Sequence, residues 1–253
     1  MAYRNLVLSF TLLAAMLLAC AGAPMHADDL DDLNKAVTTA EQAFNDAVKA
    51  DNAAQKKTEE NARAQKKAKD AGDDKEYQRL KSDGVDLKSK WREATSARLQ
   101  SERNLAAKRA ELRREASKVA EEQISAKGDT NARAKRAGDA VELWSNALKD
   151  LLPVPQVRDT KGLDDVEAAA QKQDDKSRLK DFVSWAESEK TNCQTELKRA
   201  DNLVKNEDKF KGADAHDRLH NESKKLKETL EKRVSSLDSS IESAQTRLRA
   251  LEK

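Results

Sequence analysis

Apolar residues recur along most of this chain with the three- and four-residue spacing that places them on one face of a helix. The longest uninterrupted stretch, Asp74 to Ala126, has no proline and a single glycine, Gly84. Its apolar positions form one narrow stripe: Tyr77, Leu80, Leu87, Trp91, Ala94, Leu105, Leu112 and Val119. A helix of this length extends about 80 Å at roughly 1.5 Å per residue, and so thin a stripe needs partner helices to cover it.

Similar stripes occur before and after this stretch. The first runs from Asp28 to Asp70, begins with aspartates suited to a helix N-terminus, and fades beyond Ala54. Its seam positions are Leu30, Leu33, Val37, Ala40, Phe44, Ala47 and Ala54, with Asp51 in the one gap. The second begins at Asp214 or Ala215 and carries the cleanest seam: Leu219, Leu226, Leu230, Val234, Leu237, Ile241, Ala244, Leu248 and Leu251. Both seams approximate the heptad spacing of helices that pair side by side.

Turn signals divide these helices. Ala71-Gly72-Asp73-Asp74 combines a glycine suited to a helix C-terminus with aspartates suited to the next N-cap. We therefore expect Leu30–Asp70 to fold back on Asp74–Ala126 as an antiparallel hairpin. The run Lys127-Gly128-Asp129-Thr130 repeats the signal and predicts a shorter helix over Asn131–Leu152, with Leu151 and Leu152 on its inner face.

Prolines mark the next boundary. Pro153 and Pro155 end the short helix, and 153–162 is predicted to be a hinge. Leu163–Val204 is predicted to be helical again, and Asn206–Asp214 to be a loop.

Composition supports an all-α fold without a β-sheet. Charged residues make up 37 % and aromatic residues 4 % of the 253 residues, a balance typical of coiled coils and long helices. We predict a long antiparallel helical hairpin followed by a second helical hairpin or small bundle, with thin buried seams. The net charge of +2 provides no basic excess, so no nucleic-acid partner is expected.

An export signal occupies the N-terminus. Arg4 precedes an almost wholly apolar run from Leu6 to Ala19, too short for a comfortable membrane span. The residues Leu17-Leu18-Ala19-Cys20 resemble the lipobox of bacterial lipoproteins. This resemblance implies cleavage before Cys20, acylation of its thiol and anchoring to a membrane. Ala21 in the next position, by resemblance to enteric bacteria, favours the outer membrane facing the periplasm.

Two other interpretations of the N-terminus stay open. A secretory signal cut after Ala21 or Ala27 would leave a soluble periplasmic or secreted protein, and an uncleaved anchor is the third possibility. With the lipoprotein interpretation the chain divides into a signal peptide (1–19), a lipidated Cys20 with a linker (20–27), a long hairpin with a short third helix (28–152), the hinge (153–162) and a C-terminal helical coiled-coil segment (163–253).

The only metal-like pattern is a histidine pair. His216 and His220 are spaced four apart on one helix face, a spacing able to hold a divalent metal, and Asp217 gives a pattern close to that of zinc proteases. A third ligand and a substrate cleft are missing from the pattern. We interpret both as exposed histidines, and we predict no metal, no cofactor and no catalytic residues.

Three other features admit two interpretations each. Cys193 is expected to be a buried or inert thiol at a seam edge, the alternative being a disulfide between chains. Trp91, Trp144 and Trp185 are expected to fill the thick places of an alanine-rich core, at least two of them close together, rather than to share a ligand pocket. The mildly basic stretches Lys56–Lys69 and Arg92–Arg114 are expected to be solvated faces with intrahelical ion pairs, the alternative being contact with an anionic polymer or lipid headgroups.

These features predict a structural or interaction protein rather than an enzyme. We expect a membrane-anchored spacer, scaffold or docking surface of the cell envelope, whose partners are the membrane, other envelope proteins or further copies, with no small-molecule substrate. The alternative is a periplasmic, chaperone-like protein that holds unfolded clients.

Overall fold

The computed structural model describes residues 27–148, 151–158 and 165–252, and these contain helices but no strand. The elements are α2 (Ala27–Asp70), α3 (Asp74–Ser125), α4 (Thr130–Ala147), α5 (Asp165–Lys205), the 3-10 helix η1 (Glu207–Phe210) and α6 (His216–Glu252). The predicted all-α fold is therefore confirmed. The predicted signal peptide and Cys20 lie outside the described residues.

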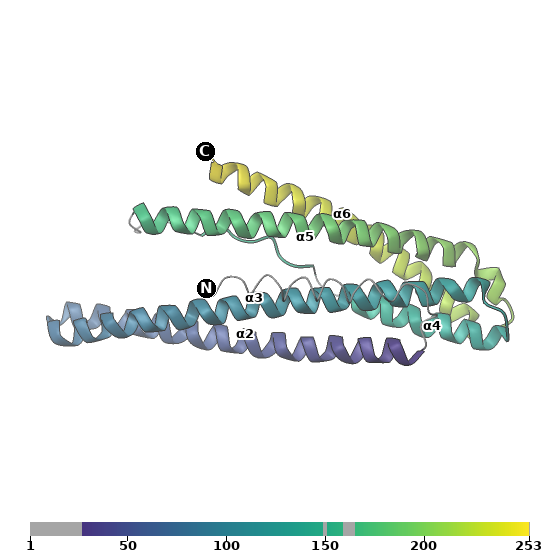
Figure 1. Ribbon diagram of the computed structural model, residues 1–253, viewed down its shortest axis with the longest axis horizontal. Helices are drawn as coiled ribbons and strands as arrows, with labels where there is room; N and C mark the ends of the chain where they lie inside the picture. The colour runs from purple at the N-terminus through teal and green to yellow at the C-terminus, as the bar shows by residue number, and fades with distance from the viewer. Residues whose placement is uncertain (1–26, 149–150, 159–164, 253) are drawn as a thin grey trace, which may run out of the picture.

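Helices α2 and α3 form the predicted antiparallel hairpin (Figure 1). Gly72 has a φ of +71°, a conformation that suits glycine at a helix end. The Asp73 carboxylate then accepts a hydrogen bond of 3.0 Å from the backbone N–H of Glu76 and caps α3. The turn chemistry visible in the sequence thus forms the closed tip of this hairpin.

Polar side chains continue the α2–α3 seam where its apolar pattern fades. The Asp51 carboxylate accepts hydrogen bonds of 2.7 Å from Thr95 Oγ1 and 2.7 Å from Arg98 Nε. Nearer the tip, Gln65 Nε2 donates to the backbone oxygen of Leu80 at 3.1 Å. A Cβ atom on Gly84 would lie 2.7 Å from this same Gln65 nitrogen, so the glycine lets the two helices approach closely. Helix α3 runs through Gly84 as predicted.

Helix α4 is shorter than predicted and ends at Ala147. Leu148 leaves the helical conformation with φ −81° and ψ 52°. Residues 151–158 are irregular, in keeping with the extended backbone that prolines impose on the residues before them. Leu151 and Leu152 therefore do not lie on a helix face, although both still pack against the core from an irregular connector.

The described part of the predicted hinge is tied to the second hairpin. Arg158 donates to the buried Asp175 carboxylate of α5 through its backbone N–H at 2.9 Å and its Nε at 2.8 Å. Arg247 of α6 donates to the backbone oxygen of Pro155 at 2.7 Å. These bonds hold residues 151–158 against α5 and α6.

Helices α5 and α6 form a second antiparallel hairpin. The predicted loop between them contains η1, and Phe210 at its end is buried. Gly212 follows with a φ of +87°. The cleanest apolar seam of the sequence lies on α6 and is buried against neighbouring helices at Leu226, Leu230 and Leu237.

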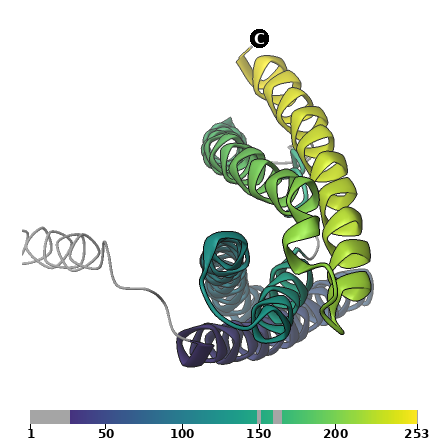
Figure 2. The ribbon, with the colours of Figure 1, turned by 90° about the vertical axis from the view of Figure 1, so that its right-hand side faces the viewer.

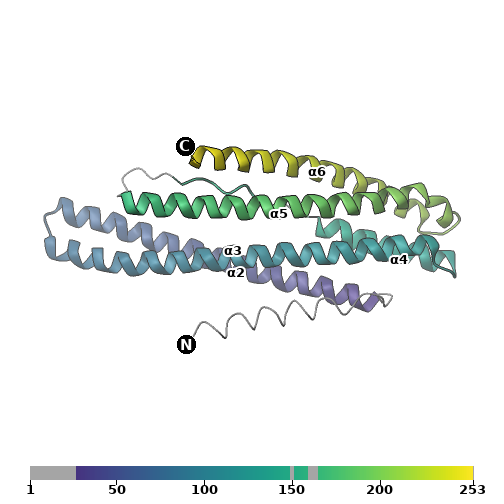
Figure 3. The same cartoon turned by 45° about the horizontal axis from the view of Figure 1, so that its top comes forward.

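The two hairpins lie along each other, with α4 where they meet (Figures 1 and 2). Ion pairs Arg103–Asp181 and Arg199–Glu121 join α3 to α5 in increasing order along both helices, so these two helices are parallel. The closed tip of α2 and α3 projects beyond the ends of α5 and α6 (Figures 1 and 3). The molecule is thus a long rod with a two-helix extension.

Small residues fill much of the core at the α4 end. Seven alanines there are at most 1 % exposed: Ala116, Ala120, Ala134, Ala137, Ala140, Ala186 and Ala200. Alanine lets helix backbones approach closely, which explains how a chain with few large apolar residues buries α3 on several sides. The bulkiest side chain enclosed there is Trp144, which is 0 % exposed.

Candidate functional site

A network of buried charges lies where the two hairpins meet. Arg113 of α3 is 2 % exposed and donates from Nη2 to Glu189 Oε1 at 2.7 Å. Its Nε lies 3.2 Å from both carboxylate oxygens of Glu196. Both glutamates belong to α5, so one guanidinium bridges two turns of the neighbouring helix.

Two further side chains complete this network. Arg233 of α6 donates to Glu189 Oε1 at 2.9 Å from Nη2, and the indole Nε1 of Trp144 on α4 donates to Glu196 Oε2 at 2.8 Å. We call Arg113, Trp144, Glu189, Glu196 and Arg233 the junction network. It contains two arginines and two glutamates, so its formal charges balance, and it connects α3, α4, α5 and α6.

Burial dominates the electrostatics of Glu196, whereas the neighbouring carboxylates raise the pKa of Arg113 against the effect of its burial. Burial raises the pKa of Glu196 above its usual range, while Arg113 and the Trp144 N–H oppose the shift by favouring the carboxylate. Burial also raises the pKa of the Cys193 thiol to about 12, with the Glu189 charge acting in the same direction. The raised pKa of Cys193 makes its thiol unreactive, because a nucleophilic cysteine needs a lowered pKa.

The sequence contained a signal for this network that apolar pattern analysis missed. Seven buried positions of α5 follow one another in alternating steps of four and three: Phe182, Ala186, Glu189, Cys193, Glu196, Ala200 and Leu203. Glu189 and Glu196 thus occupy seam positions in a regular heptad pattern. Charged residues at such positions indicate buried pairing, because an isolated buried carboxylate is too costly.

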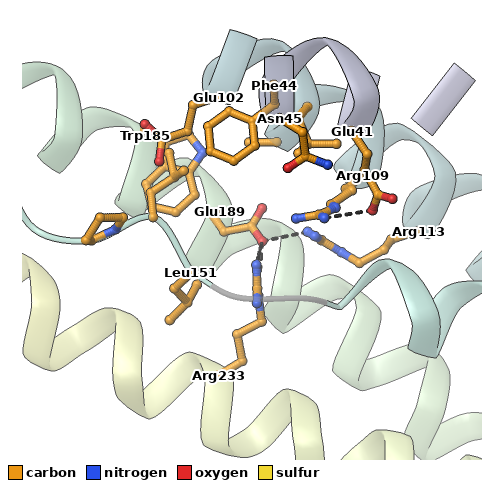
Figure 4. Close-up of a pocket in the computed structure, with 14 residues that line it drawn as sticks. Glu41, Phe44, Asn45, Glu102, Arg109, Arg113, Leu151, Trp185, Glu189 and Arg233 are labelled. Carbon is orange, nitrogen blue, oxygen red and sulfur yellow. Dashed lines mark hydrogen bonds and ion pairs between the residues drawn. The ribbon is translucent and has the colours of Figure 1, made fainter. Parts of the chain in front are cut away.

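A cavity of about 400 Å³ lies beside the junction network, between the hairpins (Figure 4). Helices α2, α3, α5 and α6 and the connector all line it. Its polar lining consists of Glu41, Asn45, Glu102, Arg109, Arg113, Glu189 and Arg233. Its apolar lining consists of Phe44, Leu105, Ala106, Leu151, Leu152, Pro153 and Trp185. The sequence carries no local signal for this cavity, because its residues come from five segments distant in sequence.

The structure gives the two predicted histidines different partners. His216 Nδ1 lies 3.0 Å from Asp217 Oδ1, whereas His220 Nδ1 contacts Glu207 of η1. Within residues 27–148, 151–158 and 165–252, no group of three His, Cys, Asp or Glu side chains is placed to hold a metal ion. The described residues therefore offer no third ligand for a metal ion held by His216 and His220.

Cys193 is a free, fully buried thiol. Its Sγ lies 3.8 Å from Glu189 Oε1, inside the α5 seam rather than at its edge. The predicted buried thiol is therefore confirmed, and the predicted partial cover is wrong because Glu189 is itself a buried residue. The alternative disulfide between chains would require local unfolding to expose the sulfur.

The three tryptophans differ in environment. Trp144 fills the core as predicted, and Trp185 is partly buried, with its ring 5.6 Å from that of Phe182. Trp91 is 36 % exposed, so the prediction that it fills the core is wrong. Its side chain is not buried in the α2–α3 seam. Of the three, Trp185 alone lines the cavity, so they do not share it.

The basic stretch of α3 pairs mainly across helices. Four of its basic side chains contact carboxylates of α2 or α5, in the pairs Arg98–Asp51, Arg103–Asp181, Arg109–Glu41 and Arg113–Glu189. The prediction of intrahelical pairs on a solvated face is therefore wrong for Arg109 and Arg113, which are largely buried. Arg98 also pairs within α3, with Glu102 at 3.9 Å, and Arg103 is exposed although its pair crosses to α5. In the other basic stretch Lys56 and Glu60 do form an intrahelical pair, at 3.9 Å, and both are exposed.

None of the helices described, α2 to α6, combines the length and apolarity that a membrane span requires. Comparison with models of known protein families, with characterised proteins and with solved structures found no match. A functional assignment must therefore come from the chain's own residues and geometry.

Proposed function

We propose that this chain is an exported, lipid-anchored helical protein of the cell envelope that acts as a stiff spacer or scaffold. The observation that carries the proposal is the α2–α3 extension, which projects beyond the second hairpin (Figure 3). A helix of 52 residues reaches about 80 Å at roughly 1.5 Å per residue, which suits an element whose role is reach. The lipobox-like residues that end at Cys20 would direct export and anchoring to the membrane.

The surface of this extension supports a role in contact rather than in catalysis. Its exposed charged residues are of both signs, in short interspersed groups: Lys56, Lys57, Glu59, Glu60, Arg63, Lys66, Lys67, Lys69, Asp70, Asp73, Asp74, Lys75, Arg79, Lys81, Asp83, Asp86, Lys88 and Lys90. Interspersed charges favour specific, salt-dependent contacts with a protein of complementary pattern over binding to a uniformly anionic surface.

The client-holding alternative has less support in the described surface. A holder of unfolded chains needs contiguous exposed apolar area. The large exposed apolar side chains are Val85, Trp91, Val157 and Val166, spread over α3, the connector and α5. We therefore favour the spacer.

The proposal is tested by replacing Cys20 with alanine in the full chain, expressed in a bacterial host with an outer membrane. We expect the unaltered chain to incorporate labelled palmitate and to sediment with membranes after a high-salt wash. Cys20→Ala should lose the label and move largely to the soluble fraction, because several acyl chains on one residue account for stable anchoring. Cys193→Ala is the matched control and should keep both properties. Membrane association that is unchanged in Cys20→Ala, without label in either protein, contradicts the proposal.

A further inference from the structure

We propose that the cavity between the hairpins binds an organic cation, a small ammonium compound with an apolar or aromatic body. The juxtaposition that carries this inference is the Glu102 carboxylate in the same cavity lining as the rings of Phe44 and Trp185 (Figure 4). The inference does not depend on the proposed spacer function. It adds a small ligand that the sequence did not predict.

Among the described residues, the charges around the cavity leave one carboxylate, that of Glu102, without a close cation. Arg109 pairs with Glu41 at 2.8 Å, and Arg113 and Arg233 both pair with Glu189, at 2.7 and 2.9 Å. Arg113 also pairs with Glu196 behind the lining. The positive charges of these three arginines are therefore balanced by Glu41, Glu189 and Glu196, and none of the three arginines is left to pair with Glu102.

The cation nearest to Glu102 in the described part of the chain is distant. The nearest ion-pair partner of Glu102 among the described residues is Arg98, whose Nη1 lies 3.9 Å away. Arg98 is already engaged, because its Nε donates to Asp51 at 2.7 Å. The Glu102 carboxylate thus keeps most of its hydrogen-bonding capacity, and the side chain is only 20 % exposed. A partly desolvated carboxylate with so weak a pairing favours a cationic ligand.

A second acceptor lies elsewhere in the lining. Every hydrogen bond that Glu189 receives from the described residues reaches its Oε1 atom, from Arg113, Arg233 and the Cys193 thiol. The Oε2 atom is therefore available to a donor within the cavity. An ammonium group, which carries donors only, suits such acceptors.

The apolar lining provides a place for the body of the ligand. Phe44 and Trp185 are both partly buried, and the contact of Trp185 with Phe182 helps to fix its ring. Aromatic faces attract a cation by about 0.5–2 kcal/mol, with tryptophan the strongest. Leu151, Leu152 and Pro153 of the connector close another side. A volume of about 400 Å³ lies within the range of small-molecule sites.

Arg109 could instead favour an anionic ligand in this cavity. Its Nε is buried and has no hydrogen-bond acceptor among the described residues. A ligand carboxylate at this atom would make the cavity an anion site instead. The experiment therefore compares probes of equal shape and different charge.

The test is titration calorimetry of the purified protein with 2-phenylethylammonium, 2-phenylethanol and 3-phenylpropionate, followed in parallel by tryptophan fluorescence. We expect saturable binding of the ammonium probe at least tenfold tighter than that of the alcohol, with a change in Trp185 emission. Glu102→Gln should weaken ammonium binding at least tenfold and leave binding of the alcohol unchanged. Glu93→Gln, an exposed change on the same helix, is the matched control and should bind like the unaltered protein.

Trp185→Leu provides an independent check. It should weaken binding of the ammonium probe several-fold while circular dichroism shows an unchanged helical content. The proposal is overturned by tighter binding of the carboxylate probe, by equal binding of all three probes, or by no saturable binding at millimolar concentration. An unchanged affinity in a folded Glu102→Gln protein also overturns it.

Discussion

Replacing Arg113 with methionine is expected to destabilise the protein by about 3–5 kcal/mol at pH 7, because it leaves the buried Glu196 carboxylate without its cation, while Glu189 keeps only Arg233. Arg113 donates hydrogen bonds to both Glu189 and Glu196, and all three are less than 5 % exposed. Urea unfolding followed by circular dichroism measures the loss. Arg103→Met is the matched control on the same helix: its pair with Asp181 is exposed, so the change should cost about 1 kcal/mol or less.

The penalty of Arg113→Met should shrink as the pH falls. The folded-state pKa of Glu196 is already raised by burial, and removing Arg113 removes a group that lowers it. The folded variant therefore takes up a proton at a pH where the unfolded chain, with a glutamate pKa of about 4.3, has not. Proton uptake by the folded state favours folding as the pH decreases through the Glu196 pKa towards the unfolded value. Both proteins are compared at each pH, so the pH effects of the carboxylates that they share cancel in the difference between their free energies of unfolding.

A second change separates this account from a simple loss of packing. Glu196→Gln in the Arg113→Met protein removes one buried charge but keeps an acceptor for the Trp144 N–H. It should recover part of the lost stability at pH 7 and flatten the pH dependence. A penalty that is the same at pH 7 and pH 5 would show that the Glu196 charge does not cause it.

The second large effect is expected at Trp144. This side chain is 0 % exposed and donates to Glu196 at 2.8 Å, so Trp144→Ala should cost about 3–5 kcal/mol through loss of buried volume. Trp144→Phe keeps most of that volume and should cost about 1.5–3 kcal/mol, the range for a hydrogen bond to a charged group. Thermal or urea unfolding measures both.

Trp91 provides the internal comparison for these changes. Because it is partly exposed on α3, Trp91→Phe should alter stability by about 0.5 kcal/mol or less. If Trp144→Phe costs no more than Trp91→Phe, the hydrogen bond to Glu196 contributes nothing to stability and the role given to Trp144 is wrong.

Local signals in the sequence were sufficient for the helices and hairpins. Gly72 and Asp73 mark the first turn because each supplies a backbone or capping feature that a hairpin needs, and both do so in the structure. The end of α4 was predicted wrongly because Leu151 and Leu152 fit an apolar helix face equally well as they fit a buried irregular segment. Only the tertiary environment, in which the connector packs against the second hairpin, decides between these.

The spacing of apolar residues cannot predict the junction network or the cavity. Glu189 and Glu196 resemble surface glutamates unless their heptad positions are read together with Cys193 and the alanines that flank them. Their partners Arg113 and Arg233 lie on other helices, 76 and 44 residues away from Glu189. No local signal in one sequence specifies a pairing at such separations.

The central claim is that the two hairpins form one stiff unit joined at the junction network, since a spacer requires a fixed shape. The most direct measurement is the distance distribution between spin labels on α3 and α6, attached to Ser96→Cys and Ser236→Cys in a Cys20→Ala protein. Both sites are exposed, and the native Cys193 is buried and should remain unlabelled. We predict one narrow distribution, which broadens in Arg113→Met. A broad or two-component distribution in the protein with Arg113 intact would contradict the claim.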